Sequence, residues 1–236
     1  MRYFITATDT DAGKTYVTTL LTRTFRKLGL PTLAIKPIAS GSLQDSLQLQ
    51  LAAENTLSLE EITPLYYQTP LAPYHAAKRE GKPFSMQQAL STFHLLEKKY
   101  SSLLVEGAGG WLVLLSENES IASLARTINF PVLVVVRNRL GAMNHALLTL
   151  QAIEHYGCHC AGMILNHHPE DRSDLVIGEY RSFFKELSEK KNFSFFLEVE
   201  ANQQELSADQ LHYIAQLIRK SEPKSEPLVE NKLFSS

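Results

Sequence analysis

Three short motifs contain the residue types best suited to chemistry, and each follows an apolar run. The first is Thr8-Asp-Thr-Asp-Ala-Gly-Lys-Thr15, which separates the apolar run Tyr3–Ala7 from a pattern of helical periodicity. A loop in this position is typical of phosphate binding, because its glycine lets the backbone approach an anion while Lys14 and the helix N-terminus attract it. The Thr15 hydroxyl can join the shell of a Mg²⁺ ion. Thr8 stands where the common form of the loop has its first glycine, so this motif alone also fits a strand–helix turn with a surface lysine.

The second and third motifs place a lysine and a carboxylate at the ends of two further apolar runs. Lys36-Pro-Ile-Ala-Ser-Gly41 follows Thr32–Ile35, and Val105-Glu-Gly-Ala-Gly-Gly-Trp111 continues the run Leu103–Val105. Two lysines that converge at one sheet edge would neutralise charge on a transferring phosphoryl group, and Glu106 would associate with Mg²⁺. The alternatives are a solvated lysine at a strand end and a tight glycine turn. Three glycines in four residues after a carboxylate favour a ligand that approaches the backbone closely.

Short apolar runs alternate with stretches of helical periodicity along the chain. The predicted strands are Tyr3–Ala7, Thr32–Ile35, Leu103–Val105, Val132–Val136 and Gly162–Leu165. The predicted helices are Thr15–Leu28, Gln87–Lys99, Ile121–Ile128, Ala142–His155 and Ser207–Arg219. The strands show no clear in/out alternation, as expected for parallel strands covered on both faces. The pattern therefore predicts an α/β fold of the P-loop NTPase type, with a doubly wound, mostly parallel sheet, helices on both faces and ligands at the carboxyl ends of the strands.

The overall composition predicts a soluble protein that acts on small molecules. The chain has 236 residues, 44% of them hydrophobic, and a formal net charge of −2, which gives no field that suggests nucleic acid or an acidic membrane as a partner. We expect one domain over residues 1–220 and a disordered tail over residues 221–236, where Ser-Glu-Pro nearly repeats. Without a signal-peptide core or a membrane-length apolar stretch, we expect a cytoplasmic location. Cys158 and Cys160 are too close for an unstrained disulfide and lack the spacing of a metal site, so we expect reduced thiols.

The three motifs, in this order, resemble those of the dethiobiotin synthetase family. That family shows Gly-Thr-Asp-Thr-x-x-Gly-Lys-Thr, then Lys-Pro-x-x-Ser-Gly, then Val-Glu-Gly-Ala-Gly-Gly. The first glycine of the family loop falls on Ala7. A fourth segment, Leu140-Gly-Ala-Met-Asn-His145, is similar to the family's Leu-Gly-x-x-Asn-His. The resemblance runs from Phe4 to about Asn166, and the combination of motifs is more specific than any one of them.

The resemblance implies an ATP-dependent ligase that closes the ureido ring of dethiobiotin from 7,8-diaminononanoate and CO₂ through a phosphorylated carbamate. Lys36 and Lys14 would be catalytic, and Mg²⁺ would be held by Thr15, Asp45 and Glu106. The stretch from Gly41 to Asp45 is shorter than is usual in the family. The residues implied for nucleotide and Mg²⁺ binding are Asp11, Ala12, Gly13, Lys14, Thr15, Tyr16, Asp45, Glu106, Gly107, Ala108, Gly109, Asn166 and His167. The residues implied for substrate binding are Thr10, Ser40, Leu140, Gly141 and Asn144.

The resemblance also implies a homodimer and leaves the nucleotide base in question. In the family, the helix that corresponds to Ala142–His155 belongs to the partner subunit, and its N-terminus receives the substrate carboxylate. A helix N-terminus suits an anion, although Asn144 and His145 would also fit as residues that merely cap and solvate the helix. Asn166 matches the family's adenine-reading asparagine. The family's Gly-x-Ile-Pro run around the base is replaced here by Leu197-Glu-Val-Glu200, which leaves nucleotide selectivity open.

Three other functions fit parts of the sequence. A deviant P-loop switch or partitioning ATPase would carry an extra lysine early in its loop, where this chain has Thr8, Asp9 and Thr10, and often a basic membrane helix at its end. The amidoligases that make cobyrinate diamides carry an additional glutaminase domain, for which this chain is too short. A degenerate nucleotide-binding module would not need both lysines and both acids.

Overall fold

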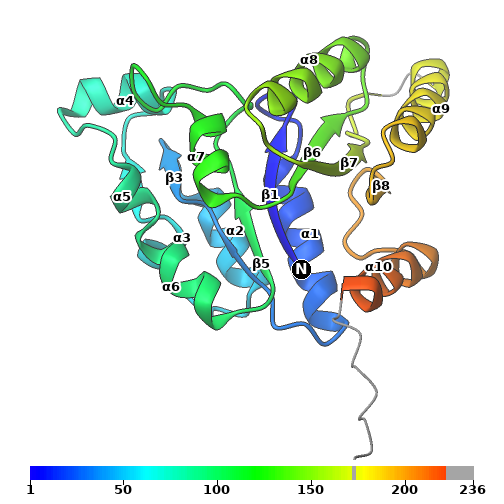
Figure 1. The fold of residues 1–236 in the computed structure, drawn as a ribbon, viewed down its shortest axis with the longest axis horizontal. Coiled ribbons are helices and arrows are strands. Elements are labelled where there is room, and N and C mark those ends of the chain that lie inside the picture. The colour runs from blue at the N-terminus through cyan, green and yellow to red at the C-terminus, as the bar shows by residue number, and fades with distance from the viewer. Residues whose placement is uncertain (172–173, 222–236) are drawn as a thin grey trace, which may run out of the picture.

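A parallel sheet forms the centre of the computed structural model, which describes residues 1–171 and 174–221 (Figure 1). Its six strands run in the order β2-β5-β1-β6-β7-β8. They are β1 (Arg2–Ala7), β2 (Leu33–Ile35), β5 (Leu103–Glu106), β6 (Val132–Arg137), β7 (Cys160–Asn166) and β8 (Phe195–Val199). Every strand pair in this sheet is parallel. The carboxyl ends of the strands therefore meet at one edge of the sheet, where ligands bind in such folds.

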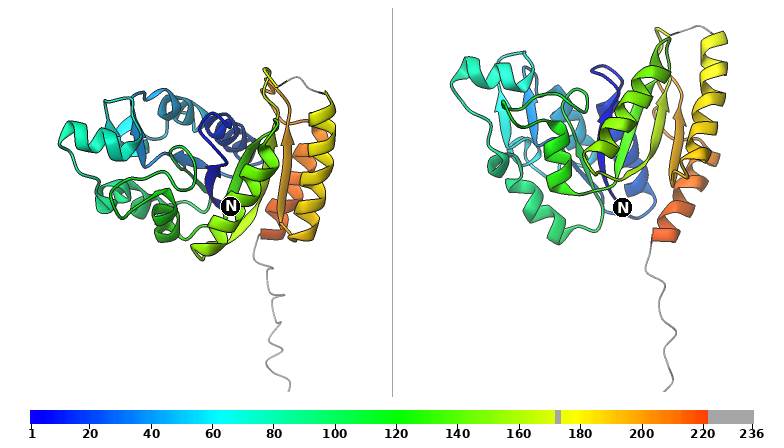
Figure 2. Two further views of the ribbon diagram at one scale, coloured as in Figure 1. Left: turned by 90° about the horizontal axis from the view of Figure 1, so that it is seen from above. Right: turned by 45° about the horizontal axis from the view of Figure 1, so that its top comes forward.

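Helices cover both faces of this sheet. The view from above in Figure 2 shows α1 (Lys14–Lys27) on one side and α7 (Ile121–Ile128) and α8 (Ala142–His155) on the other. The remaining helices are α2 (Gln44–Ala52), α3 (Leu59–Ile62), α4 (Pro73–Glu80), α5 (Met86–Ala89), α6 (Ser91–Lys99), α9 (Asp174–Lys190) and α10 (Ala208–Ser221). Two short strands, β3 (Ile38–Ser40) and β4 (Leu65–Tyr67), form a separate parallel pair. The predicted doubly wound α/β fold is confirmed.

The predicted elements agree with the structure except at one helix. All five predicted strands are present, each with bounds within two residues of the prediction. The predicted helix Gln87–Lys99 is wrong as a single element, because Leu90 adopts φ −96° and ψ 1° and separates α5 from α6. The first of the two helices, α5, begins at Met86 because Ser85 caps it. The Ser85 side chain accepts a hydrogen bond from the Gln88 backbone N–H.

The domain limits and the tail remain predictions. The described residues share one cluster of buried side chains, which extends from Phe4 to Ile218. The disordered tail predicted over residues 221–236 lies outside the described residues, apart from Ser221 at the end of α10. Among the helices that the structure describes, none has the length and apolar character needed to cross a bilayer.

Candidate active site

The loop between β1 and α1 has the backbone shape of a phosphate-binding loop. Its positive φ angles lie at Asp11 (59°) and Gly13 (90°), not at Ala7 or Thr8. A Cβ atom at Gly13 would lie 2.2 Å from Nδ2 of Asn166, so this position requires glycine for space as well as for conformation. The family's first glycine is dispensable here because the backbone at that point needs no left-handed residue.

Two lysines enter this region from different elements. Lys14 begins α1, is 7% exposed, and its Nζ donates to the Asp9 carbonyl over 3.5 Å. Burial lowers the pKa of Lys14, although the Glu106 carboxylate acts in the opposite direction. Lys36 follows β2 directly and is 6% exposed. Burial would lower the pKa of Lys36, but the charges of Glu106 and Asp45 outweigh it and raise the pKa, so this ammonium group stays charged.

The two acids and the threonine meet at Lys36. The Lys36 Nζ donates to Oε1 of Glu106 over 2.9 Å and also to Oδ2 of Asp45. The Thr15 hydroxyl donates to the same Glu106 oxygen over 2.7 Å. Asp45 reaches this point from the first turn of α2, so the shorter spacing after Gly41 does not move it out of the site. The structure thus brings together all five residues predicted for phosphoryl transfer and Mg²⁺ binding, the fifth being Lys14.

A cavity of about 620 Å³ opens beside these groups. It is lined by Thr10, Asp11, Gly13, Lys14, Thr15, Tyr16, Lys36, Asp45, Gly109, Arg137, Asn166, His167, His168, Pro169, Glu170 and Asn202. Its volume is that of an ordinary small-molecule site. Most of the residues predicted to bind nucleotide therefore face one space at the carboxyl edge of the sheet.

Four residues predicted to bind nucleotide lie behind the cavity wall. Ala12, Glu106, Gly107 and Ala108 are buried and are not among the described residues that line the cavity. Glu106 makes hydrogen bonds to two residues that do line the cavity, Lys36 and Thr15. A Cβ atom at Gly107 would lie 3.0 Å from Ile121, so this glycine permits close packing of β5 against α7.

The predicted substrate residues fall into two groups. Thr10 lines the cavity. Ser40, at the end of β3, donates its hydroxyl to the Leu71 carbonyl over 2.6 Å and does not reach the cavity. Leu140, Gly141 and Asn144 lie at the N-terminus of α8 on the surface, and within the described residues of one chain they do not border the cavity.

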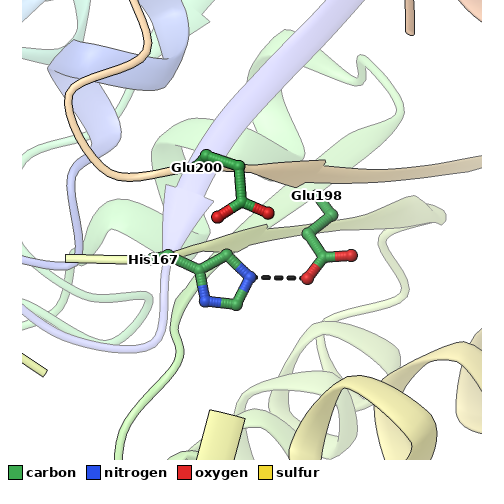
Figure 3. Close-up of side chains that lie close together, drawn as sticks. All are labelled: His167, Glu198 and Glu200. Carbon is green, nitrogen blue, oxygen red and sulfur yellow. Dashed lines mark hydrogen bonds and ion pairs between the residues drawn. The ribbon is translucent and has the colours of Figure 1, made fainter. Parts of the chain in front are cut away.

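At the far end of the cavity, Asn166 and His167 follow β7. The Asn166 Nδ2 donates to the Ala12 carbonyl over 3.0 Å, while its buried Oδ1 has no partner among the described residues. The His167 Nε2 lies 2.6 Å from Oε1 of Glu198 (Figure 3), and its Nδ1 lies 3.4 Å from Nδ2 of Asn138. Since both ring nitrogens face protein groups, His167 lines the cavity without a free polar ring atom.

The altered segment Leu197–Glu200 lies next to this end of the site and does not itself line the cavity. It comprises the end of β8, and the Tyr16 hydroxyl donates to the carbonyls of Glu200 (3.2 Å) and Gln203 (2.6 Å). The side chains of His167, Glu198 and Glu200 lie close together (Figure 3). Arg181 pairs with both of these carboxylates. This charge pairing accounts for the cluster as an ion-pair network rather than a metal site, and hydrogen bonds from His167 and Arg181 lower the pKa of Glu198 against the opposing effect of burial.

Sequence reasoning missed five residues that line the cavity: Arg137, His168, Pro169, Glu170 and Asn202. Arg137 could have been found, because it ends an apolar strand at the same sheet edge as Lys36 and Glu106. The loop after β7 and the turn after β8 carry the others, and no motif marked them.

Arg137 fixes the loop that bears His168, Pro169 and Glu170. Its Nη2 lies 3.2 Å from both Oδ1 of Asp171 and Oε2 of Glu170, and its Nε also contacts Asp171. We expect Arg137→Ala to raise the KM for a nucleotide that binds in this cavity about ten-fold with little change in kcat, because the cavity wall loses its support at the end opposite the predicted phosphate site. Asp171→Asn should raise KM in the same direction. A fall in kcat without a change in KM would contradict this assignment.

Comparison with known proteins identifies the family. A family model described as an AAA domain matches residues 1–208. The ATP-dependent dethiobiotin synthetase BioD of Akkermansia muciniphila is 37% identical over 190 residues, which cover 80% of this chain and 89% of the relative. The protein of the same name from Cellvibrio japonicus is 41% identical over 172 residues, which cover 70% of this chain and 75% of the relative.

Solved structures show the same fold at low identity. The pNOB8 ParA structure bound to nonspecific DNA superposes with a TM-score of 0.56 at 11% identity, covering 94% of this chain and 99% of that one. A putative plasmid partition protein from Borrelia burgdorferi bound to AMPPNP gives 0.55 at 10% identity, covering 93% and 98%. These likenesses concern the fold alone. The identity and coverage of the sequence relatives show that this chain belongs to the dethiobiotin synthetase family.

Proposed function

We propose that this protein is an ATP-dependent dethiobiotin synthetase, a ligase that closes the ureido ring from 7,8-diaminononanoate, CO₂ and ATP. The observation that carries the proposal is the convergence of Lys14, Thr15, Lys36, Asp45 and Glu106 at one cavity behind a phosphate-binding loop. The names of its sequence relatives favour this reaction over the switch or partitioning ATPase that the loop also fits.

The reaction requires positioning and charge stabilisation rather than a protein nucleophile. One substrate amine adds to CO₂ and loses a proton, which gives a carbamate. A carbamate oxygen then attacks the γ-phosphorus of ATP, and ADP leaves. The second amine attacks the carbamoyl carbon, and phosphate leaves as the C–O bond breaks. Lys14 and Lys36 supply positive charge beside the phosphoryl oxygens, where it stabilises the transition state most.

The donor set beside Lys36 fits Mg²⁺. Asp45 and Glu106 offer carboxylate oxygens and Thr15 a hydroxyl, which are the hard ligands that this ion prefers. In the described part of the chain, Oε2 of Glu106 is buried without a hydrogen-bond partner, as expected of an atom that serves a ligand. When bound, Mg²⁺ would neutralise negative charge on the phosphates. We assign Thr15, Asp45 and Glu106 to this ion, and Asn166, through its unpaired Oδ1, to an amino group of the base.

A second copy of the chain would supply the substrate carboxylate site. The predicted carboxylate-binding residues Leu140, Gly141 and Asn144 do not line the cavity of their own chain, which is consistent with a role at the cavity of a partner. Exposed leucines accompany them on the same helix, including Leu148, which is 56% exposed. This apolar surface and the placement of the α8 N-terminus support a homodimer.

We expect Leu148→Glu to produce a monomer and to lower kcat/KM for the diamine about ten-fold or more, because a buried charge opposes association. Light scattering gives the mass, and steady-state kinetics give the activity. Leu95→Glu is the matched control, since Leu95 is an exposed leucine (73%) on α6. A fully active monomer would rule out the shared site.

An ADP-release assay with MgATP and bicarbonate tests the function itself. We expect strict dependence on 7,8-diaminononanoate. Hydrolysis without the diamine, stimulated by DNA or lipid, would instead select the switch or partitioning ATPase.

Cys158 and Cys160 are free thiols, which supports the expected cytoplasmic location of the enzyme.

A further inference from the structure

Lys36 contacts the two carboxylates to which the proposed function assigns Mg²⁺. Its ammonium group lies between Oε1 of Glu106, at 2.9 Å, and Oδ2 of Asp45. Lys36 is 6% exposed and Glu106 is 0% exposed, so their contact is shielded from water, whereas the Asp45 side chain is 45% exposed. Removal of one partner from a buried ion pair costs free energy, because the charge of the other partner is left without compensation.

Among the described residues, only one of the two Glu106 carboxylate oxygens takes part in hydrogen bonds. Its Oε1 accepts hydrogen bonds from both Lys36 and Thr15. Its Oε2 has no hydrogen-bond partner among the residues described. Lys36 therefore links the two carboxylates that are expected to share one metal ion, and Glu106 in turn holds the Thr15 hydroxyl.

Mg²⁺ and the ammonium group of Lys36 compete for the same two carboxylates. The ion needs oxygen ligands at about 2.1 Å. An ammonium group has three donors and no lone pair, so it cannot become a ligand. A lysine that kept its contact with Oε1 would lie close to a dication and would be repelled by it.

We propose that Lys36 and Mg²⁺ exchange at Asp45 and Glu106. Without the metal, the ammonium group of Lys36 holds the two carboxylates together. When Mg²⁺ binds, it displaces this group from the carboxylates into the adjoining cavity, where the charge becomes available to phosphoryl oxygens. This inference rests on the proposed function, because it takes the metal ligands from it.

The exchange has an electrostatic consequence for the order of binding. Before the metal enters, the charges of Lys14 and Lys36 balance those of Asp45 and Glu106. Binding of Mg²⁺ adds two positive charges to a buried site, and this excess is stabilised only when an anionic nucleotide follows. We therefore expect the metal to bind weakly to the nucleotide-free protein and tightly in the presence of nucleotide. We attribute this difference in metal affinity to the competition from Lys36.

Mn²⁺ binding to the nucleotide-free full chain, followed by the EPR signal of the free ion, tests the exchange. We expect Lys36→Met to bind Mn²⁺ about ten-fold more tightly than the unsubstituted protein, because the competing cation is gone. Lys14→Met is the matched control. It removes a nearby charge that makes no hydrogen bond to Glu106, so its gain should be smaller. Unchanged or weaker Mn²⁺ binding by Lys36→Met would overturn the proposal.

A second measurement needs no substitution, in case Lys36→Met leaves Glu106 unpaired and fails to fold. In the ¹⁵N-lysine NMR spectrum, a protected ammonium signal from Lys36 should be present without metal. It should shift or exchange faster with solvent when Mg²⁺ and ADP are added together, but not with ADP alone. A signal that stays unchanged with both present contradicts the exchange. Neither measurement contains the diamine, so failure to form dethiobiotin would refute the proposed function without affecting these results.

Discussion

Substitution of Lys36 by glutamine is expected to lower kcat by about 10³-fold while the protein keeps its fold. The side chain is buried beside the cavity, and its charge is maintained by Asp45 and Glu106. Glutamine retains a hydrogen-bond donor for Glu106 but has no charge to place on the phosphoryl oxygens. The loss should therefore fall on kcat and leave the KM for ATP nearly unchanged, since Lys14 and the loop backbone, which we propose as the phosphate-binding groups, remain in place.

Lys27→Gln provides the control for this experiment. Lys27 lies at the opposite end of α1 from Lys14, and its ion pair with Glu205 is solvent-exposed. This variant should retain full activity, because exposed ion pairs contribute little. An unchanged turnover rate in Lys36→Gln, with circular dichroism showing a native fold, would remove Lys36 from the transition state.

Substitution of Gly162 by alanine is expected to destabilise the protein by roughly 3 kcal/mol or more. A Cβ atom at Gly162 would lie 1.7 Å from the Phe195 carbonyl oxygen and 2.6 Å from its carbon. These are backbone atoms of the neighbouring strand, so β7 and β8 must move apart. Because β8 carries Glu198, which contacts His167, the affinity for nucleotide should fall as well.

Gly178→Ala is the matched substitution on α9. No atom of the described residues lies within 4 Å of the added Cβ, and the glycine is exposed within the helix. Alanine should stabilise this helix by about 0.5–1 kcal/mol. Urea unfolding measures both variants, and a Gly162→Ala protein as stable as the unsubstituted one would contradict the close approach of the two strands.

The sequence predicted the central sheet because its strands are short apolar runs. It failed where the local pattern was misleading or too short. Leucine and glutamine alternate from Leu47 to Leu51 as apolar and polar residues would in a strand, yet this segment lies within α2. The strands β3 and β4 have three residues each, too few to show a period. β8 does alternate, with Phe195, Leu197 and Val199 buried, but its Glu198 belongs to the segment that departs from the family's base-binding run.

The phosphate end of the site could be predicted because its residues follow strands directly. Parallel strands bring Lys36 and Glu106 to the same edge as the loop after β1, whatever the length of chain between them. The other end depends on contacts between loops that no periodicity encodes. The pairing of Arg137 with Asp171, and the turn that brings Asn202 to the cavity, arise from tertiary structure alone.

The fate of oxygen from CO₂ tests the central claim, which is phosphorylation of a carbamate at this site. The protein is mixed with MgATP, the diamine and ¹⁸O-labelled CO₂, and the phosphate released in the first turnovers is analysed by mass spectrometry. Because the carbamate oxygen that attacks the γ-phosphorus leaves with it, the account predicts one ¹⁸O atom in each phosphate. Phosphate that takes its new oxygen from water instead would show that the site hydrolyses ATP and would contradict the account.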